Sequence, residues 1–423
     1  MKLIVKKSAL VQYMLIYLLI CFQGSIGFRA YNSVFIITAM LTMIMVVLTK
    51  KNNIPSHYLL FLFMLLLLFL FEVAITDGGT QISSVVSIMS RYAIVLAAYY
   101  YDEKFFADRF VKMMIFFAVV SLIGFVIVEI SPAILQTILV KRSETVTTYW
   151  KTYSVDFYGT FLFAFTNATE RNIGIFHEPG LYQIVLNATL YILLFKRNML
   201  RITNRKWTIY CAIIIVTIIT SMSTTGLIGM VGLLLVYTLF ARNEKTNSSK
   251  MKYVLVIGLA AFGIYCFFAD ADSFINKYVF SKIMSNGKLD FSSSTGSSRI
   301  MSMLSDISIF RHHILGIGYS KYKTAFRENL LDETIPDLSS CVGFTQVLAV
   351  FGIIVFLFIL GYYAFLIRRN LNKEEGLAFL FIFINTGLAQ PYIWFPAFVV
   401  LLLLGENRTK YVYDNLDLKV IKY

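Results

Sequence analysis

The residue types best suited to chemistry gather in one short stretch, Arg171-Asn-Ile-Gly-Ile-Phe-His-Glu-Pro-Gly180. Pro179 fits the first turn of a helix, because the N–H that it lacks has no helical partner there. Since a proline also disfavours helical angles at the residue before it, Glu178, we expect the helix to begin near Pro179. A helix N-terminus presents free N–H donors and a partial positive charge to an anion. The stretch therefore predicts an anion site.

Three side chains of this stretch have chemical roles in such a site. Arg171 can grip a phosphate through two parallel hydrogen bonds. His177 and Glu178 are the candidate groups for proton transfer. The alternative for Glu178 is a structural one, in which its carboxylate caps the start of the helix. The sequence leaves both interpretations open.

A second set of candidates begins at Arg299. It precedes an apolar stripe with helical spacing, which predicts a short amphipathic helix on the membrane interface; the stripe comprises Ile300, Met303, Leu304 and Ile307. The following segment, Arg311 to Tyr322, contains a Gly-Ile-Gly sequence that permits a backbone path close to a ligand, or an ordinary turn. Tyr319 and Tyr322 can stack on sugar rings, and His313 is a third candidate for glycan contact.

Charged residues inside the apolar spans form a third set. Glu72 lies near the predicted outer end of its span, and Arg91 lies deeper in the next one. Ionisable groups at such depth are costly and usually face a cavity or a partner. A structural ion pair between adjacent helices is one interpretation, and a deep cation for a bound anion is the other.

The elements that must position these residues are membrane spans. The chain of 423 residues is 58% hydrophobic and only 15% charged, with a mean hydropathy of +0.72, whereas soluble proteins are about a quarter charged. Apolar runs long enough to cross ~30 Å of hydrocarbon fill most of it. We predict an all-α integral membrane protein, a single polytopic domain over residues 1–423. Its roughly 12 spans lie near 8–27, 31–49, 57–76, 81–100, 111–131, 174–195, 207–221, 225–241, 252–270, 340–361, 375–389 and 391–405.

Lys and Arg set the orientation of these spans. If the N-terminus is placed inside, most Lys and Arg residues fall in cytoplasmic segments. The short outer turns then contain only Arg29. Both termini are therefore predicted to be cytoplasmic, with two long extracytoplasmic loops at 132–173 and 271–339. The net charge of +14 reflects this topology, so we expect no nucleic-acid partner.

These features together resemble the O-antigen polymerase and O-antigen ligase superfamily of bacterial envelope proteins. The resemblance covers roughly residues 170–405. It rests on the stretch from Arg171 to Pro179, the hairpin Ser221-Met-Ser-Thr-Thr-Gly226, and Arg299 followed by Leu315-Gly-Ile-Gly-Tyr319 and a span containing Gly352.

The resemblance implies an enzyme of the bacterial inner membrane whose active face is periplasmic and which needs no metal or other cofactor. Its donor and acceptor are polyprenyl-diphosphate-linked oligosaccharides in the lipid bilayer. A polymerase transfers the growing glycan to the next lipid-linked repeat unit of O-antigen or capsule, and a ligase transfers it to lipid A core. Ligases carry a histidine just before the span equivalent to that of Gly352. Here Asp337-Leu-Ser-Ser-Cys-Val-Gly343 has none, which favours a polymerase.

On this interpretation Arg171, Arg299 and the deeper Arg91 bind the diphosphate, because the arginine fork matches phosphate oxygens. Glu178 is the first choice for the general base, and His177 is the second. A chain-length regulator is left open as a further partner. The alternative from another class is a lipid-glycan flippase, which requires a continuous polar path through the bundle.

Overall fold

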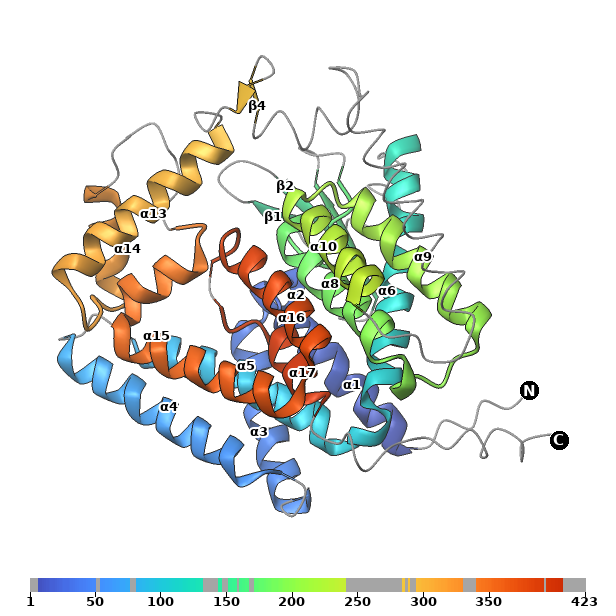
Figure 1. Cartoon of the computed structure of the whole chain (residues 1–423), viewed down its shortest axis with the longest axis horizontal. Coiled ribbons are helices and arrows are strands. Elements are labelled where there is room, and N and C mark those ends of the chain that lie inside the picture. Colours follow the sequence, from blue (N-terminus) through green and yellow to red (C-terminus); the bar gives the residue numbers. More distant parts are fainter. Residues whose placement is uncertain are drawn as a thin grey trace.

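A computed structural model describes residues 7–50, 54–76, 81–131, 144–146, 151–157, 160–166, 171–240, 284–285, 288–289, 294–329, 340–391 and 393–405. These residues form an almost entirely helical bundle (Figure 1). The N-terminal part contains α1 (Lys7–Cys21), α2 (Ile26–Ala30), α3 (Asn32–Lys50), α4 (Ser56–Ile75), α5 (Ile82–Tyr101) and α6 (Glu103–Ile130). It is followed by α8 (Pro179–Phe195), η2 (Arg197–Met199), α9 (Asn204–Thr220), α10 (Thr224–Phe240), α13 (Ser294–His312), α14 (Tyr319–Glu328), α15 (Gly343–Asn370), α16 (Lys373–Gly387) and α17 (Pro396–Leu403).

Within the described ranges, five helices are long and apolar enough to cross a membrane, namely α3, α4, α5, α6 and α15. Shorter apolar helices are α1, α8 and α10. This confirms the predicted class, a helical membrane protein. The predicted span at 252–270 lies outside the described residues, while each of the others coincides with a helix. The number of spans and their sidedness stay predictions.

Large apolar side chains cover the outer surface of several of these helices. On α3, Leu48 is 77% exposed, and Leu60 and Phe63 on α4 are more than half exposed. In water such an apolar surface would cause the protein to associate or aggregate. Around a membrane protein it is the surface that contacts lipid tails.

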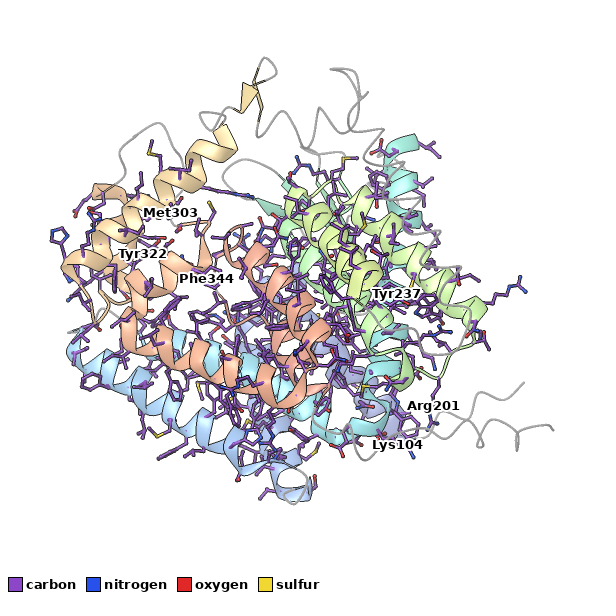
Figure 2. All side chains as sticks on the ribbon, in the orientation of Figure 1. Lys104, Arg201, Tyr237, Met303, Tyr322 and Phe344 are labelled. Atoms are coloured by element: carbon purple, nitrogen blue, oxygen red, sulfur yellow. The ribbon has the colours of Figure 1, made fainter. Side chains whose placement is uncertain are left out.

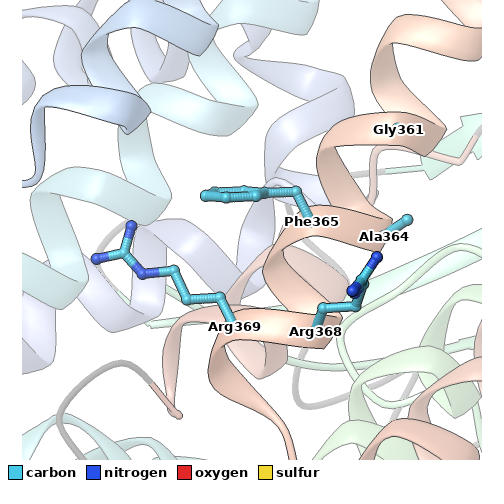
Figure 3. Close-up of a pocket in the computed structure, with 5 residues that line it drawn as sticks. All are labelled: Gly361, Ala364, Phe365, Arg368 and Arg369. Atoms are coloured by element: carbon cyan, nitrogen blue, oxygen red, sulfur yellow. The ribbon is translucent and has the colours of Figure 1, made fainter.

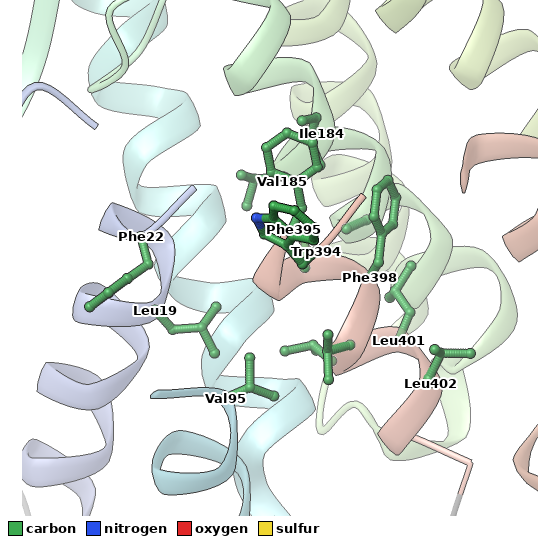
Figure 4. Close-up of a cluster of buried hydrophobic side chains, with 14 of the residues drawn as sticks. Leu19, Phe22, Val95, Ile184, Val185, Trp394, Phe395, Phe398, Leu401 and Leu402 are labelled. Carbon is green, nitrogen blue, oxygen red and sulfur yellow. The ribbon is translucent and has the colours of Figure 1, made fainter. Parts of the chain in front are cut away.

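Helix α17 and the segment before it form the centre of the packed interior. The Trp394 and Phe398 side chains are almost completely buried. They belong to the same buried cluster as residues of α1, α5 and α8, including Leu19, Val95 and Val185 (Figure 4). Pro396 occupies the first turn of α17, so the helix begins there rather than at the predicted residue 391, because proline cannot continue a helix from before it.

Helix α15 differs most from the predicted span at 340–361. It continues to Asn370, and Tyr363 and Leu366 beyond the predicted end are buried. These two side chains continue the inward-facing stripe at helical spacing, so packing extends the helix past the apolar run. Gly352 interrupts α15 with φ 74° and ψ 178°, which kinks it.

The predicted outer loop at 132–173 contains strands that the sequence interpretation did not include. β1 (Glu144–Val146), β2 (Lys151–Phe157) and β3 (Thr160–Thr166) form an antiparallel sheet in the order β1-β2-β3. The signal was present, because β2 and β3 are rich in aromatic and β-branched residues, which favour strands. The other long loop contains the short pair β4 (Met284–Ser285) and β5 (Lys288–Leu289), besides α13 and α14.

Segments predicted on the same side of the membrane contact one another. Two predicted outer segments meet where the Lys321 Nζ donates to the Thr76 carbonyl at 2.8 Å. At the predicted inner ends, the Lys196 Nζ lies 2.9 Å from the Glu375 carboxylate. Figure 2 shows Lys104 and Arg201 at one end of the molecule, and Met303 and Tyr322 at the other. These contacts join helix ends that the sequence places on one side, and the sidedness itself stays a prediction.

Candidate functional site

The predicted anion site is built on the segment from Arg171 to the start of α8. Its backbone pairs with the turn after α1, where the Ile26 N–H donates to the Ile175 carbonyl at 3.1 Å. Ser25 and Phe176 form an antiparallel bridge beside this bond. The chain around residue 25, at the far end of the sequence, is therefore part of the site.

A local turn fixes the shape of this segment. The Asn172 side chain accepts from the Gly174 N–H at 3.1 Å and donates to the hydroxyls of Ser121 and Thr220, each at 3.2 Å. Gly174 adopts φ +58°, and an added Cβ would lie 2.7 Å from the Tyr182 ring. The spacing Asn172-Ile-Gly174 therefore has a structural cause, since it lets the chain turn tightly against α8.

His177 is held in a defined orientation by the first turn. Its Nδ1 lies 2.9 Å from the carbonyl oxygen of Gly24. A carbonyl oxygen only accepts, so Nδ1 carries the proton and Nε2 has a free lone pair. In this tautomer the Nε2 atom is the one able to take up a proton.

The pKa of His177 is lowered from its usual range, mainly because burial penalises the charged imidazolium. Glu178 raises the pKa of this imidazole, and the positive charge of Arg29 lowers it further. The imidazole is accordingly neutral at pH 7 and ready to act as a base. Arg29 is exposed, but its charge acts on His177, and the sequence interpretation did not assign it to the site. Its signal was its position as the single cation in the short outer turns.

Glu178 stands at the N-cap position of α8 with extended backbone angles, φ −151° and ψ 150°. Its side chain makes no capping hydrogen bond to the helix, although it is only partly buried. The described structure thus shows no capping hydrogen bond from Glu178. Whether the carboxylate acts as a base or stabilises the helix start through its charge stays a prediction.

Two buried amides border the same segment. Gln390 packs so closely on the α8 start that a Cβ added to Gly180 would lie 2.0 Å from its Nε2. In the described part of the chain, the Gln390 Oε1 and both amide atoms of Gln23, next to Gly24, have no hydrogen-bond partner. Buried polar groups are nearly always paired with protein, water or ligand. These amides are therefore polar groups beside the segment that a bound polar ligand can pair with.

Arg91 approaches the site from α5. Its guanidinium carbon lies 5.9 Å from the centre of the Phe28 ring, and Phe28 precedes Arg29 in the chain. Arg171 lies at the opposite end of the Asn172 turn and is partly exposed. Glu72 is buried on the adjacent helix α4, and its pairing with Arg91 stays a prediction.

The second group of candidates lies on α13 and α14, which pack on α15. Arg299 is partly exposed in the first turns of α13, and His313 is exposed just after its end. Tyr319 is partly buried, with its ring centre 5.9 Å from the Lys323 Nζ. These residues are positioned by α13–α15, whereas His177 and Glu178 are positioned by α8 and the turn after α1.

Tyr322 requires a correction, because its side chain is 1% exposed. Its hydroxyl donates to the Asp306 Oδ1 at 2.6 Å, and the Thr345 hydroxyl donates to the Oδ2 at 2.7 Å. Burial raises the pKa of the Asp306 carboxyl to about 6, although hydrogen bonds from Tyr322, Thr345 and Ser340 oppose the shift. Tyr322 therefore holds α13 and α14 on α15, and we no longer assign it to a glycan surface.

The glycine pair of Leu315-Gly-Ile-Gly-Tyr319 also has a structural explanation. Gly316 and Gly318 both have positive φ. An added Cβ on Gly316 would lie 2.6 Å from the Val350 carbonyl oxygen. The backbone that these glycines approach is thus the kinked part of α15. The segment is a tight turn packed on that helix, and we do not assign it to a ligand.

The fold and the site together define a helical membrane protein with a histidine and a carboxylate at an outward-predicted helix start. No protein-family model matches the chain, and no curated protein sequence matches it either. Its function is accordingly argued from the site.

Proposed function

We propose that this protein is a membrane glycosyltransferase that polymerises polyprenyl-diphosphate-linked repeat units of O-antigen or capsule, on the outer side of the bacterial inner membrane. One observation carries the proposal. At the start of α8, an uncapped Glu178 adjoins a neutral His177 whose Nδ1 is bound to Gly24, with the charge of Arg29 nearby. A base and a cation at one site suit transfer from a diphosphate.

The reaction joins two sugars at the anomeric carbon of the donor. The acceptor hydroxyl oxygen forms the new bond to this carbon, and the bond between the carbon and the diphosphate oxygen breaks. Its electron pair leaves with the polyprenyl diphosphate. The hydroxyl proton passes to the Glu178 carboxylate, or to the Nε2 of His177 as the second choice.

The cations stabilise the leaving group. Negative charge grows on the diphosphate as the bond breaks, so fixed positive groups beside it lower the barrier. Arg171 begins the segment, the charge of Arg29 acts on His177 from α2, and Arg91 on α5 lies 5.9 Å from the ring of Phe28, the neighbour of Arg29. Arg299, on α13, is proposed to contact the second lipid-linked substrate or its diphosphate.

Deletion of the gene in the host, followed by gel analysis of surface glycan, tests the class of activity. Loss of long chains with single repeat units retained supports a polymerase. Loss of both overturns it in favour of a ligase or a flippase.

Site variants then test the assignment of the base. Glu178→Gln keeps size and hydrogen bonding but cannot take a proton, so long chains should disappear at normal protein level. His177→Asn keeps a donor for the Gly24 carbonyl but lacks the Nε2 base, and it should reduce long chains less if Glu178 is the base. Glu374→Gln is the matched control, because Glu374 is a carboxylate in the first turn of another helix, α16. Normal long chains in Glu178→Gln would remove Glu178 from the mechanism.

A further inference from the structure

A hollow of about 500 Å³ opens on the surface of α15 near its C-terminal end, far along the helix from Gly343 (Figure 3). Its lining comes from one side of the helix and comprises Gly361, Ala364, Phe365, Arg368 and Arg369. Figure 3 shows the Phe365 ring and the Arg369 side chain extending to one side, and Arg368 beside Ala364. The hollow thus combines two cations with an apolar floor.

The small residues of α15 create the space. An added Cβ at Gly361 would meet no atom within 4 Å, so the helix surface is open at this position. Ala364 contributes only a methyl group one turn further on. Phe365 is 45% exposed and forms an apolar wall, and the Arg369 guanidinium carbon lies 5.9 Å from its ring centre.

The hollow lies where a lipid-facing surface meets a charged helix end. Toward the middle of α15, Ile354 and Leu357 expose their apolar side chains. In the other direction, Arg368 and Arg369 form the basic last turn. This order, apolar surface followed by cations, matches the order of acyl chain and phosphate headgroup in a lipid leaflet.

We propose that this hollow binds an anionic phospholipid. Arg368 and Arg369 contact its phosphate through charge-assisted hydrogen bonds, for which the guanidinium fork is suited. The space beside Gly361 and Ala364 takes the glycerol and the upper acyl chain, against Phe365. The alternative is that these arginines only set topology and offset the helix dipole. That role requires neither a hollow nor a preference among headgroups. The proposal is independent of the glycosyltransferase activity.

Native mass spectrometry of the full-length protein in detergent tests the proposal. The protein is mixed with dioleoyl phosphatidylglycerol or with dioleoyl phosphatidylcholine, and bound lipid is counted. We expect preferential binding of phosphatidylglycerol. Each cation near an anionic group contributes about 1 kcal/mol, so the double variant Arg368→Ala/Arg369→Ala should bind it roughly 30-fold more weakly.

Two further variants separate a site from general charge. Arg205→Ala/Lys206→Ala removes two adjacent exposed cations from the start of α9, and it should keep the lipid preference. Gly361→Leu places its Cβ in open space, extends a side chain into the hollow and keeps both arginines, so it should lose bound phosphatidylglycerol without a fall in unfolding temperature.

Four results would each overturn the proposal. They are equal binding of the two lipids by the natural protein, an unchanged preference in Arg368→Ala/Arg369→Ala, an equal loss in the α9 control, and normal binding by Gly361→Leu. Competition with inorganic phosphate identifies the ligand. A lipid site is not emptied by inorganic phosphate, and complete displacement by it would show a site for the free anion instead.

Discussion

Replacing Gly352 by alanine should detach the segment before α14 from the kink of α15. Gly352 has φ 74° and ψ 178°, a combination that is essentially restricted to glycine. An added Cβ would lie 2.2 Å from the carbonyl carbon of Leu315. Because this neighbour is backbone and not the end of a flexible side chain, one of the two chains must move.

The cost has two parts. Backbone strain at such angles costs about 1–3 kcal/mol. Movement of the segment also breaks the backbone hydrogen bonds across the kink, each worth about 1 kcal/mol. They are Ile317 N to Ala349 O at 3.1 Å, Gly318 N to Val350 O at 3.0 Å and Ile353 N to Ile314 O at 3.0 Å. We therefore expect a total loss of about 4–6 kcal/mol.

Thermal unfolding of the purified protein in detergent measures this loss. At roughly 2 °C per kcal/mol, the midpoint of Gly352→Ala should fall by about 10 °C. The matched control is Gly361→Ala in the same helix, where the added methyl meets open space. It should leave the midpoint unchanged or raise it slightly, because alanine favours a helix by about 1 kcal/mol. Equal midpoints for Gly352→Ala and the natural protein would refute the reasoning.

Three further predictions concern single side chains. Asp306 has a pKa of about 6 when folded against an ordinary 3.8, so stability should fall by about 3 kcal/mol as pH rises from 4 through 6. Asp306→Asn, which mimics the protonated acid, should flatten that slope in unfolding experiments, and an unchanged slope would exclude Asp306 as its source. Glu178→Gln should abolish long glycan chains on gels, whereas a normal ladder would exclude the base role. Glu375→Gln should lower the unfolding free energy by about 3 kcal/mol, because it strands the buried Lys196 charge; denaturant titration with no change would contradict this.

Local signals identified the start of the site. Pro179 placed the beginning of α8 correctly, since the residue type itself decides the backbone there. The partners of the site were not readable. Gly24 and Gln390 come from opposite ends of the chain, and only packing brings such segments together.

The sequence pattern also failed to show the partners of the second group of candidates, the residues of α13 and α14. The stripe after Arg299 indicated a helix, and α13 lies there. The Gly-Ile-Gly sequence indicated a tight backbone, which is present, but its partner is α15 and not a ligand. A glycine in the sequence indicates that a side chain would not fit at that position. It does not indicate which atoms lie there.

The sequence by itself determined the helical membrane class. The length and hydropathy of an apolar run are enough to show that lipid surrounds it, and in lipid such a run must be helical. It also determined where α8 begins and where cations gather. The tertiary structure decided which of these residues work together. It bound His177 to Gly24 and exposed it to the charge of Arg29, buried Tyr322 against Asp306, and formed a hollow beside Arg368. Contacts between distant segments depend on how whole helices pack, and no local pattern of residues contains that information.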